Sequence, residues 1–316
     1  MMPTDQLRPI GAHSPAGGGL ATASLKYAAA IGAEAMQIFV TNPRAWAASR
    51  GSEKQTGALR EYVAETGFPV FVHAPYLINV GSPDPVVRSR SATLLGQCLQ
   101  RAAAIGAGGV VVHAGSAITA DREAGLGRVR QTLLPLLDAL PKDSRGGPDL
   151  LIEPMAGQGN MLCAGIGDIA PYLAAIDWHP RVQLCIDTCH LFAAGHDLTA
   201  ADGVASVLAE LAKAAPGRLK LIHANDAKDG CGSRKDRHEN IGLGTLGTGP
   251  FWDLLHHPAT AGIPFIVETP GGEKGHNTDV TALKRLRRSA RRPGRRLAVS
   301  TAQRASDAPR GCRSDP

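Results

Sequence analysis

Paired cysteines, long apolar runs and a basic leader are all absent from this 316-residue sequence. The six cysteines are scattered and none forms a Cys-x-x-Cys pair, which argues against a disulfide framework and fits a reducing compartment. No apolar run reaches about 18 residues, so we expect no membrane-spanning helix. The first residues show no basic segment followed by an apolar stretch, so we expect no secretion signal and a cytoplasmic location.

A net positive charge is also missing from most of the chain, although the formal net charge of the whole chain is +6. Residues 284–316 contain eleven basic and two acidic residues, so residues 1–283 have a net charge of −3. We expect 284–288 to end a helix, where cations complement the macrodipole. Residues 289–316 lack periodicity and are rich in Arg, Ser, Ala and Pro, which is typical of a disordered basic tail. Such a tail is either a solvated extension or a contact for nucleic-acid phosphates.

Eight short apolar runs, separated by Ala- and Leu-rich segments with helical spacing, are what the sequence does contain. Hydrophobic residues make up 43% of the chain, enough for a sizeable core. Continuous apolar runs are typical of strands buried in a parallel sheet, and helices are expected in segments such as 19–33, 89–107 and 201–217. The runs are RPIGAH, AEAMQIFVT, FPVFVHAPY, GGVVVHAGS, DLLIEPM, VQLCIDTCH, LKLIHAND and PFIVETP.

Eight strand–helix units predict an α/β fold, a single (β/α)8 TIM barrel, over residues 1–288. An open doubly wound sheet is the alternative. The first run is not followed by the glycine-rich phosphate-binding sequence that many such sheets carry, and this weakens the alternative.

Polar side chains stand at or near the end of each apolar run, and seven of the eight are His, Asp or Glu. In a barrel, the carboxyl ends of the strands converge on one mouth, where active sites lie. Packing so many carboxylates and imidazoles together is costly unless something compensates their charge, and a metal cluster would do so. These residues are His13, Gln37, His73, His113, Glu153, Asp187, His223 and Glu268.

Two short motifs add spacing typical of metal ligands. DTCH places Asp187 and His190 three residues apart, where we expect a strand to turn into a loop. DRH places Asp236 and His238 two apart, so both point to one side of an extended segment. Mixed imidazole and carboxylate ligands suit zinc, and are compatible with manganese or iron. The cysteines at 185 and 189 lie in an apolar run, and we interpret them as buried hydrophobes.

The motifs, taken in order, resemble those of the endonuclease IV family of apurinic/apyrimidinic (AP) endonucleases. The resemblance runs from about Ile10 to Thr269, and CIDTCH and DRH are its most specific parts. The other motifs that carry it are GAHSPAGGGL, HAPYLIN, VVHAGS, AGQG, HANDAK, DRHENIGLG and ETP.

The resemblance implies a (β/α)8 barrel with three metal ions at its mouth, usually Zn²⁺, with Mn²⁺ or Fe²⁺ as alternatives at one site. All nine implied ligand positions carry the residue type that the family uses, and one glutamate bridges two ions. The implied ligands are His73, His113 and Glu153 for the first ion; Glu153, Asp187, His223 and Glu268 for the second; and His190, Asp236 and His238 for the third.

The implied activity is hydrolysis of the phosphodiester 5′ to an abasic site in double-stranded DNA, which leaves a 3′-hydroxyl. Trimming of blocked 3′ ends is expected as well. Clustered dications would stabilise the charge that builds on the phosphate. Glu153 and Glu268 are the expected catalytic residues, and Glu268 would also help to orient the attacking oxygen.

Recognition of DNA requires other residues. By the resemblance, Arg44, Tyr76 and Leu77 are the loop side chains that contact DNA at the lesion, where a missing base makes flipping less costly. We expect a monomer and no protein partner. Two departures from the family pattern, Pro154-Met155 in place of Asn-Thr and Ala45 in place of a polar residue, leave the ligands intact.

Two other functions remain to be weighed at this point. One is a TIM-barrel sugar isomerase or epimerase with one or two metals, which would not need the ligands His190, Asp236 and His238. The other is a DNA-binding protein that has lost catalysis and binds through its basic tail. The intact set of ligands argues against the second.

Overall fold

Eight parallel strands close into a barrel in the order β1-β10-β7-β6-β5-β4-β3-β2 in a computed structural model that describes residues 7–47, 51–119, 121–141 and 147–293. This closure confirms the predicted (β/α)8 barrel, and the open doubly wound sheet is wrong. Every one of the eight apolar runs contains a barrel strand. The barrel strands are β1 (Ile10–His13), β2 (Met36–Ile38), β3 (Val70–His73), β4 (Gly109–His113), β5 (Asp149–Glu153), β6 (Val182–Asp187), β7 (Leu219–His223) and β10 (Phe265–Val267).

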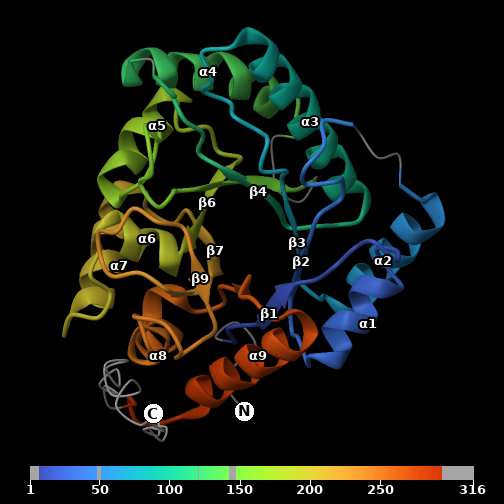
Figure 1. The fold of residues 1–316 in the computed structure, drawn as a ribbon. Helices are drawn as coiled ribbons and strands as arrows, with labels where there is room; N and C mark the ends of the chain where they lie inside the picture. Colours follow the sequence, from blue (N-terminus) through green and yellow to red (C-terminus); the bar gives the residue numbers. More distant parts are fainter. Residues whose placement is uncertain (1–6, 48–50, 120, 142–146, 294–316) are drawn as a thin grey trace, which may run out of the picture.

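Helices surround the barrel, as Figure 1 shows in a view along its axis. Of the segments expected to be helical, 19–33 and 201–217 contain α1 and α7, whereas 89–107 overlaps α3, which begins earlier, at Pro85. Within the described residues, no helix is both long enough and apolar enough to cross a membrane. The helices are α1 (Ala23–Ala30), α2 (Glu53–Thr66), α3 (Pro85–Ala104), α4 (Arg122–Asp138), α5 (Ile169–Ala175), α6 (Thr188–Ala194), α7 (Gly203–Ala214), α8 (Gly249–His256) and α9 (Gly272–Arg288), with short 3₁₀ turns at Ile166–Asp168 and Pro258–Thr260.

Local sequence explains where several helices begin and end. Asp84 accepts a hydrogen bond from the Val86 N–H at the start of α3, and Asp121 caps α4 in the same way through the Ala124 N–H. Gly67 ends α2 with a left-handed φ of 66°. As predicted, α9 ends in a basic turn.

The start of the expected tail packs against α8. Trp252 Nε1 donates a hydrogen bond to the Ser289 carbonyl, and Arg292 forms an ion pair of 2.6 Å with Asp253. The rest of the expected tail, residues 294–316, lies outside the described residues.

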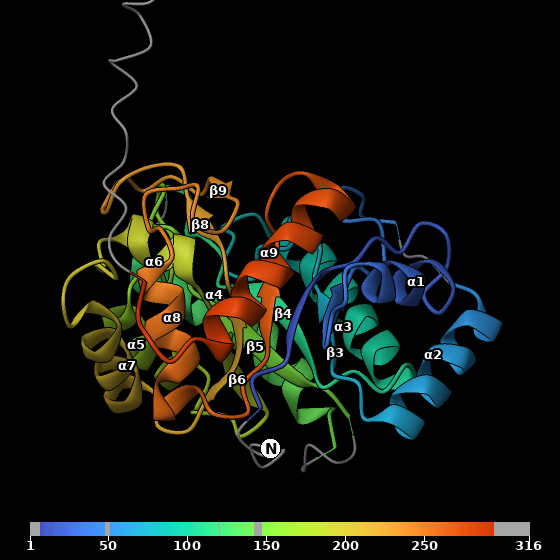
Figure 2. The same cartoon turned by 90° about the horizontal axis from the view of Figure 1, so that it is seen from below.

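A small antiparallel hairpin follows β7, and Figure 2 shows it at one end of the barrel. It consists of β8 (Asp226–Ala227) and β9 (His238–Glu239), with Ala227 paired to His238. Asp229 accepts two 2.6 Å hydrogen bonds from Arg237 and so ties the ends of the connecting loop together. The hairpin therefore folds the DRH motif back over the end of β7.

Inward-facing side chains fill the barrel in layers. One apolar layer has a residue from seven of the eight strands or directly before them: Ala35, Phe71, Val111, Leu151, Cys185, Leu221 and Ile266, all buried. In β1 the corresponding position is Gly11, where a Cβ would lie only 1.7 Å from the Ala35 carbonyl oxygen. Because side chains in a strand alternate with a period of two, the residue two positions later faces the interior again. That next layer is the mouth of the barrel.

Candidate metal centre

All nine predicted ligands meet at the barrel mouth. Six belong to the layer directly above the apolar one, since each follows a residue of that layer by two positions. The other three come from α6 (His190), from the segment that leads into β9 (Asp236) and from β9 itself (His238). Five overlapping sets of these side chains and two cysteines lie close enough to hold a metal ion, and two of the sets are the implied ligands of the first and second ions. The implied third set is divided between two others, Asp187, His190 and His238 in one and Cys189, Asp236 and His238 in the next.

The first group consists of His73, His113 and Glu153. Both histidines present Nε2 to Glu153 Oε2, at 3.4 Å from His73 and 3.5 Å from His113. The Nδ1 of His73 lies 2.7 Å from the Ala74 carbonyl oxygen, which can only accept a hydrogen bond, so Nδ1 carries the proton. The lone pair of His73 Nε2 is therefore free to bind a cation.

The second group shares Glu153 and adds Asp187, His223 and Glu268. His223 Nδ1 lies 3.0 Å from Glu153 Oε1, 3.3 Å from Glu268 Oε2 and 4.0 Å from Asp187 Oδ2. Three carboxylates around one imidazole nitrogen is an arrangement that a dication would stabilise. Glu153 faces the first group with one oxygen and this group with the other, so it can bridge two ions.

The third group consists of His190, Asp236 and His238. Each histidine places Nε2 at 3.2 Å from Asp236 Oδ1. Each also directs Nδ1 at a backbone carbonyl, of Pro154 at 3.1 Å from His190 and of Glu268 at 3.3 Å from His238. Both rings therefore point the Nε2 lone pair toward the same place, beside Asp236.

A helix follows β6 directly, so the expectation of a loop after Asp187 is wrong. Asp187 is the N-cap of α6, and its Oδ1 accepts a hydrogen bond of 3.0 Å from the His190 N–H. The cap fixes the two ligands of the DTCH motif relative to each other. The other oxygen of Asp187, Oδ2, lies 3.4 Å from His238 Nε2 and so connects the second group to the third.

Several of these atoms are buried without any hydrogen bond among the described residues. They are Glu153 Oε2, His190 Nε2 and His238 Nε2. Each has an oppositely charged partner within 3.5 Å but not in hydrogen-bonding geometry. Buried polar atoms are rarely left unpaired, and these face shared points that a cation could occupy. The residues therefore fit metal binding, and their mixture of imidazole and carboxylate suits zinc.

The electrostatics of the groups are consistent with this interpretation. Burial lowers the pKa of His113 to about 4, which keeps its nitrogen available as a ligand. Burial would also lower the pKa of His190 and His238, but Asp187 and Asp236 raise these values to about 10 and about 9, so both rings carry a second proton at neutral pH until a cation displaces it from Nε2. Burial would raise the pKa of Glu153, but the neighbouring histidines hold it well below its usual value. The carboxylates thus retain their negative charge and require positive charge around them.

The residues expected to contact DNA lie outside the three groups. Tyr76 is 56% exposed, and its ring centroid is 5.6 Å from that of His73 and 5.9 Å from that of His113. Leu77 follows it and is half-buried. Arg44 is exposed in the loop after β2, where its backbone N–H donates to Asn42 Oδ1. Tyr76 thus lies directly beside the first group, whereas Arg44 is placed by a separate loop.

Sequence reasoning missed two side chains at the mouth. Phe39 packs its ring against His13, His73 and Tyr76, at centroid distances of 4.4, 5.6 and 5.5 Å. Asn225 is fully buried, donates to Asp187 Oδ2 at 2.7 Å and accepts from the Glu268 N–H at 2.8 Å. Asn225 lies two residues after a ligand in the HAND motif, which is the signal that could have identified it.

The departure at residues 154–155 does not disturb the ligands. Proline has no N–H to donate, but the Pro154 carbonyl accepts the hydrogen bond of His190 Nδ1. Met155 is buried, and its backbone N–H donates to the Cys163 carbonyl at 2.9 Å. Cys185 and Cys189, interpreted as hydrophobes, are both fully buried, although each lies close enough to two ligands to join a metal-binding group.

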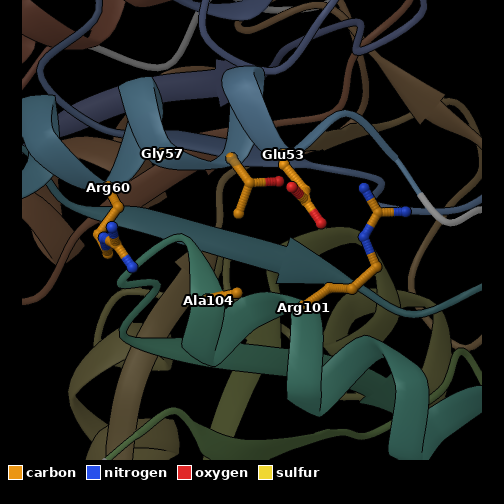
Figure 3. Close-up of a pocket in the computed structure, with 6 residues that line it drawn as sticks. Glu53, Gly57, Arg60, Arg101 and Ala104 are labelled. Carbon is orange, nitrogen blue, oxygen red and sulfur yellow. The ribbon is translucent and has the colours of Figure 1, made fainter.

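A surface groove of about 390 Å³ lies away from this site, between α2 and α3. Figure 3 shows Glu53 and Arg60 on one side and Arg101 and Ala104 on the other. None of its lining residues belongs to the three groups. The groove is therefore not part of the candidate metal centre.

The fold and the site together define a class of protein: a TIM barrel with a candidate multi-metal centre at its mouth. Known proteins specify that class further. A family model described as the xylose isomerase-like TIM barrel matches residues 25–288. The probable endonuclease 4 of Streptomyces coelicolor is 51% identical to this chain over 281 residues, which cover 88% of this chain and 95% of the relative. The chain belongs to the endonuclease IV family, within the xylose isomerase-like TIM barrels.

Solved structures agree with this assignment. Endonuclease IV from Thermus thermophilus matches with a TM-score of 0.77 and 31% identity, covering 88% of this chain and 98% of that chain. A 3-keto-D-glucoside 4-epimerase from E. coli matches with a TM-score of 0.63 and 18% identity, covering 89% and 99%. The second likeness shows a shared fold alone. Sequence similarity therefore favours the endonuclease over the sugar isomerase.

Proposed function

We propose that this protein is a metal-dependent AP endonuclease that acts in DNA repair. It hydrolyses the phosphodiester 5′ to an abasic site in double-stranded DNA, leaves a 3′-hydroxyl, and trims blocked 3′ ends. The observation that carries the proposal is the meeting of nine imidazole and carboxylate ligands at one mouth, with buried ligand atoms left unpaired. Family membership supports the same reaction class.

Three zinc ions are the cofactors that this set of ligands suits best, with Mn²⁺ or Fe²⁺ as the alternative at one site. When bound, the ions neutralise the phosphate charge and lower the pKa of water to make it a nucleophile at neutral pH. The first group would hold one ion, the second group another, and the third group the last. Glu153 would bridge the first two.

The chain's own groups position the reaction. Glu153 directs one oxygen into each of two groups, which fixes the separation between their centres. Glu268 accepts a hydrogen bond of 2.6 Å from Gln37 at Oε1, while its Oε2 faces His223. The carboxylate is thereby held in one orientation, in which it can both bind a cation and orient the attacking oxygen.

Recognition of the lesion falls to the exposed side chains around the mouth. Tyr76, with Leu77 beside it, would enter the DNA at the unpaired position; its exposed ring next to His73 supports this role. Arg44 would contact the backbone from the loop after β2. The body of the chain, residues 1–283, is acidic overall, so the dications would supply the positive potential where the phosphate binds.

Cleavage of a defined duplex tests the proposal. The protein is incubated with an end-labelled duplex that contains one abasic analogue, with and without a chelator, beside an undamaged duplex of the same sequence. We expect incision 5′ to the lesion, loss of incision with the chelator, and a product that a polymerase extends. A metal-loaded protein that fails to incise would overturn the proposal. A metal content of one or two per chain, together with turnover of a ketose, would favour the isomerase.

We further propose that residues 1–288 act as a monomeric catalytic domain and that the basic tail contributes only a phosphate contact. Because residues 289–293 pack against α8, truncation after residue 293 removes the tail without disturbing that helix. We expect lower affinity for DNA and a shallower dependence of affinity on salt. If both are unchanged, the tail is not a phosphate contact.

A further inference from the structure

Gln37 connects three residues of the mouth, although it is not among the nine proposed ligands. Its side chain is fully buried. Its Oε1 lies 2.9 Å from His223 Nε2, while its Nε2 lies 2.6 Å from Glu268 Oε1 and 3.1 Å from His13 Nδ1. One amide thus contacts two histidines and a carboxylate at once.

The orientation of this amide follows from what each partner can do. An ionised carboxylate only accepts hydrogen bonds, so the NH₂ of Gln37 must face Glu268. The Oε1 of Gln37 then faces His223 and can only accept, which requires a proton on His223 Nε2. The lone pair of a neutral His223 must therefore be on Nδ1, the atom that faces Glu153, Asp187 and Glu268.

The same amide determines the proton position of His13. His13 Nδ1 lies 3.1 Å from the amide nitrogen of Gln37 and 3.4 Å from Glu268 Oε1. We infer that the shorter contact prevails, in which Nδ1 accepts from the second N–H of the amide, because Glu268 Oε1 already accepts the 2.6 Å hydrogen bond of Gln37. A neutral His13 then carries its proton on Nε2. That atom is buried and has no hydrogen-bond partner among the described residues. His13 therefore has an N–H donor at the mouth that no described protein group uses.

His223 differs in this respect from three other histidine ligands. His73, His190 and His238 each direct the nitrogen that faces away from the cluster at a backbone carbonyl. The corresponding nitrogen of His223 contacts the side chain of Gln37 instead. Its orientation can therefore be changed by a single substitution, without moving the backbone.

We propose that Gln37 is a positioning residue that fixes the protons of two histidines: it directs His223 Nδ1 to the metal and leaves His13 Nε2–H free to donate to the substrate phosphate. The inference rests on the proposed function, because it assumes that the second group holds an ion. Hydrogen bonds that orient a histidine ligand typically change metal affinity 10–100-fold when they are removed.

The test replaces Gln37 with methionine, which has a similar length but no amide. The matched control is Gln183→Met in β6, where the side chain donates, within the described residues, to the Pro180 carbonyl at the opposite end of the barrel. Zinc stoichiometry and affinity are measured by competition with a chromophoric chelator, and histidine tautomers by ¹⁵N NMR of the zinc-loaded protein. We expect Gln37→Met to lower the affinity for one of the zinc ions about 10–100-fold. Gln183→Met should leave the affinity for every zinc ion unchanged.

The NMR measurement on the unsubstituted protein keeps the inference testable even if Gln37→Met does not fold. We expect His13 protonated on Nε2 and His223 protonated on Nε2 with Nδ1 bound to metal. In folded Gln37→Met, we expect His13 to become a mixture of tautomers. A His13 proton on Nδ1 in the unsubstituted protein, or unchanged zinc affinity in the folded variant, overturns the inference. Neither readout uses DNA, so a failure of AP endonuclease activity in the unsubstituted, metal-loaded protein would be recognised separately.

Discussion

The two ends of this barrel bury charged side chains in opposite ways. At the amino end, Arg181 is almost completely buried, pairs with Asp149 at 2.7 Å, and donates its remaining hydrogen bonds to the carbonyls of Pro141, Gly147 and Pro148. At the carboxyl end, Glu153 and the neighbouring histidines lie farther from oppositely charged groups, at 3.0 to 3.5 Å, and several of their atoms have no hydrogen bond among the described residues.

The difference separates a structural charge from one that is available to a ligand. A buried ion pair is tolerated when additional hydrogen bonds satisfy both partners, as they do around Arg181. Buried polar atoms without partners are rare, and they are retained where something else binds them. Burial and charge alone would not distinguish the two ends. The number of atoms without a hydrogen bond distinguishes them. We therefore expect substitutions at the carboxyl end to lower activity and substitutions at the amino end to lower stability.

The largest effect is expected at the mouth, for Glu153→Gln. An amide is a weaker ligand than a carboxylate, and this residue faces two groups, so we expect the rate of abasic-site cleavage to fall about 10³-fold or more. The protein should remain folded, as measured by circular dichroism. The change in rate is measured under single-turnover conditions at saturating metal. Cleavage at the original rate would contradict the assignment of Glu153.

The converse is expected at the amino end, for Asp149→Asn. This substitution leaves the Arg181 charge buried without its carboxylate, so we expect a loss of about 3 kcal/mol in the free energy of unfolding. Chemical denaturation measures it. Cleavage per folded molecule should be unchanged, because the pair lies at the end of the strands opposite the ligands. If stability is retained and activity falls instead, the comparison between the two ends fails.

The strand pattern predicted the fold because each strand and each helix can be recognised from a short stretch of sequence. Short apolar runs and helical segments repeat eight times, and a parallel sheet of eight such units closes as a barrel. The period-two alternation of a strand also explains the ligands: His73, His113 and Glu153 stand two residues after the inward-facing Phe71, Val111 and Leu151. The positions of six of the nine proposed ligands therefore follow from the sequence once the barrel is assumed.

Contacts between distant segments could not be obtained in this way. Nothing local to Gln37 indicates that its amide lies between His223 and Glu268, because these pairings depend on how three strands align across the barrel. The helix after Asp187 was missed for a related reason. A segment of only seven residues, Thr188–Ala194, is compatible with a loop until the cap between Asp187 and His190 is seen.

A smaller effect is expected where the mouth is more open, for Asp236→Asn. Asp236 lies between His190 and His238. An amide at this position should lower the affinity for the third ion about 10–100-fold, while the other two ions stay bound. Zinc analysis after dialysis against a weak chelator should give about two ions per chain in place of the proposed three. Because an ion that binds only the folded state stabilises it, the chelator should also lower the thermal midpoint of the unsubstituted protein more than that of this variant. An equal decrease would mean that Asp236 holds no ion.

The smallest effect is expected for a mouth residue that is proposed to contact DNA but no metal. Tyr76→Ala removes a ring that lies against His73 and His113 and is more than half exposed, so the ligands should keep their ions. Loss of stacking on an unpaired base or sugar should weaken DNA binding by about 1–2 kcal/mol, roughly 10-fold in KM, with little change in kcat. Tyr76→Phe retains the ring and is the matched control, with KM expected near the original value. If zinc is lost instead, Tyr76 supports the metal centre and does not recognise the lesion. Tyr76 would then belong with the metal-binding residues, next to His73.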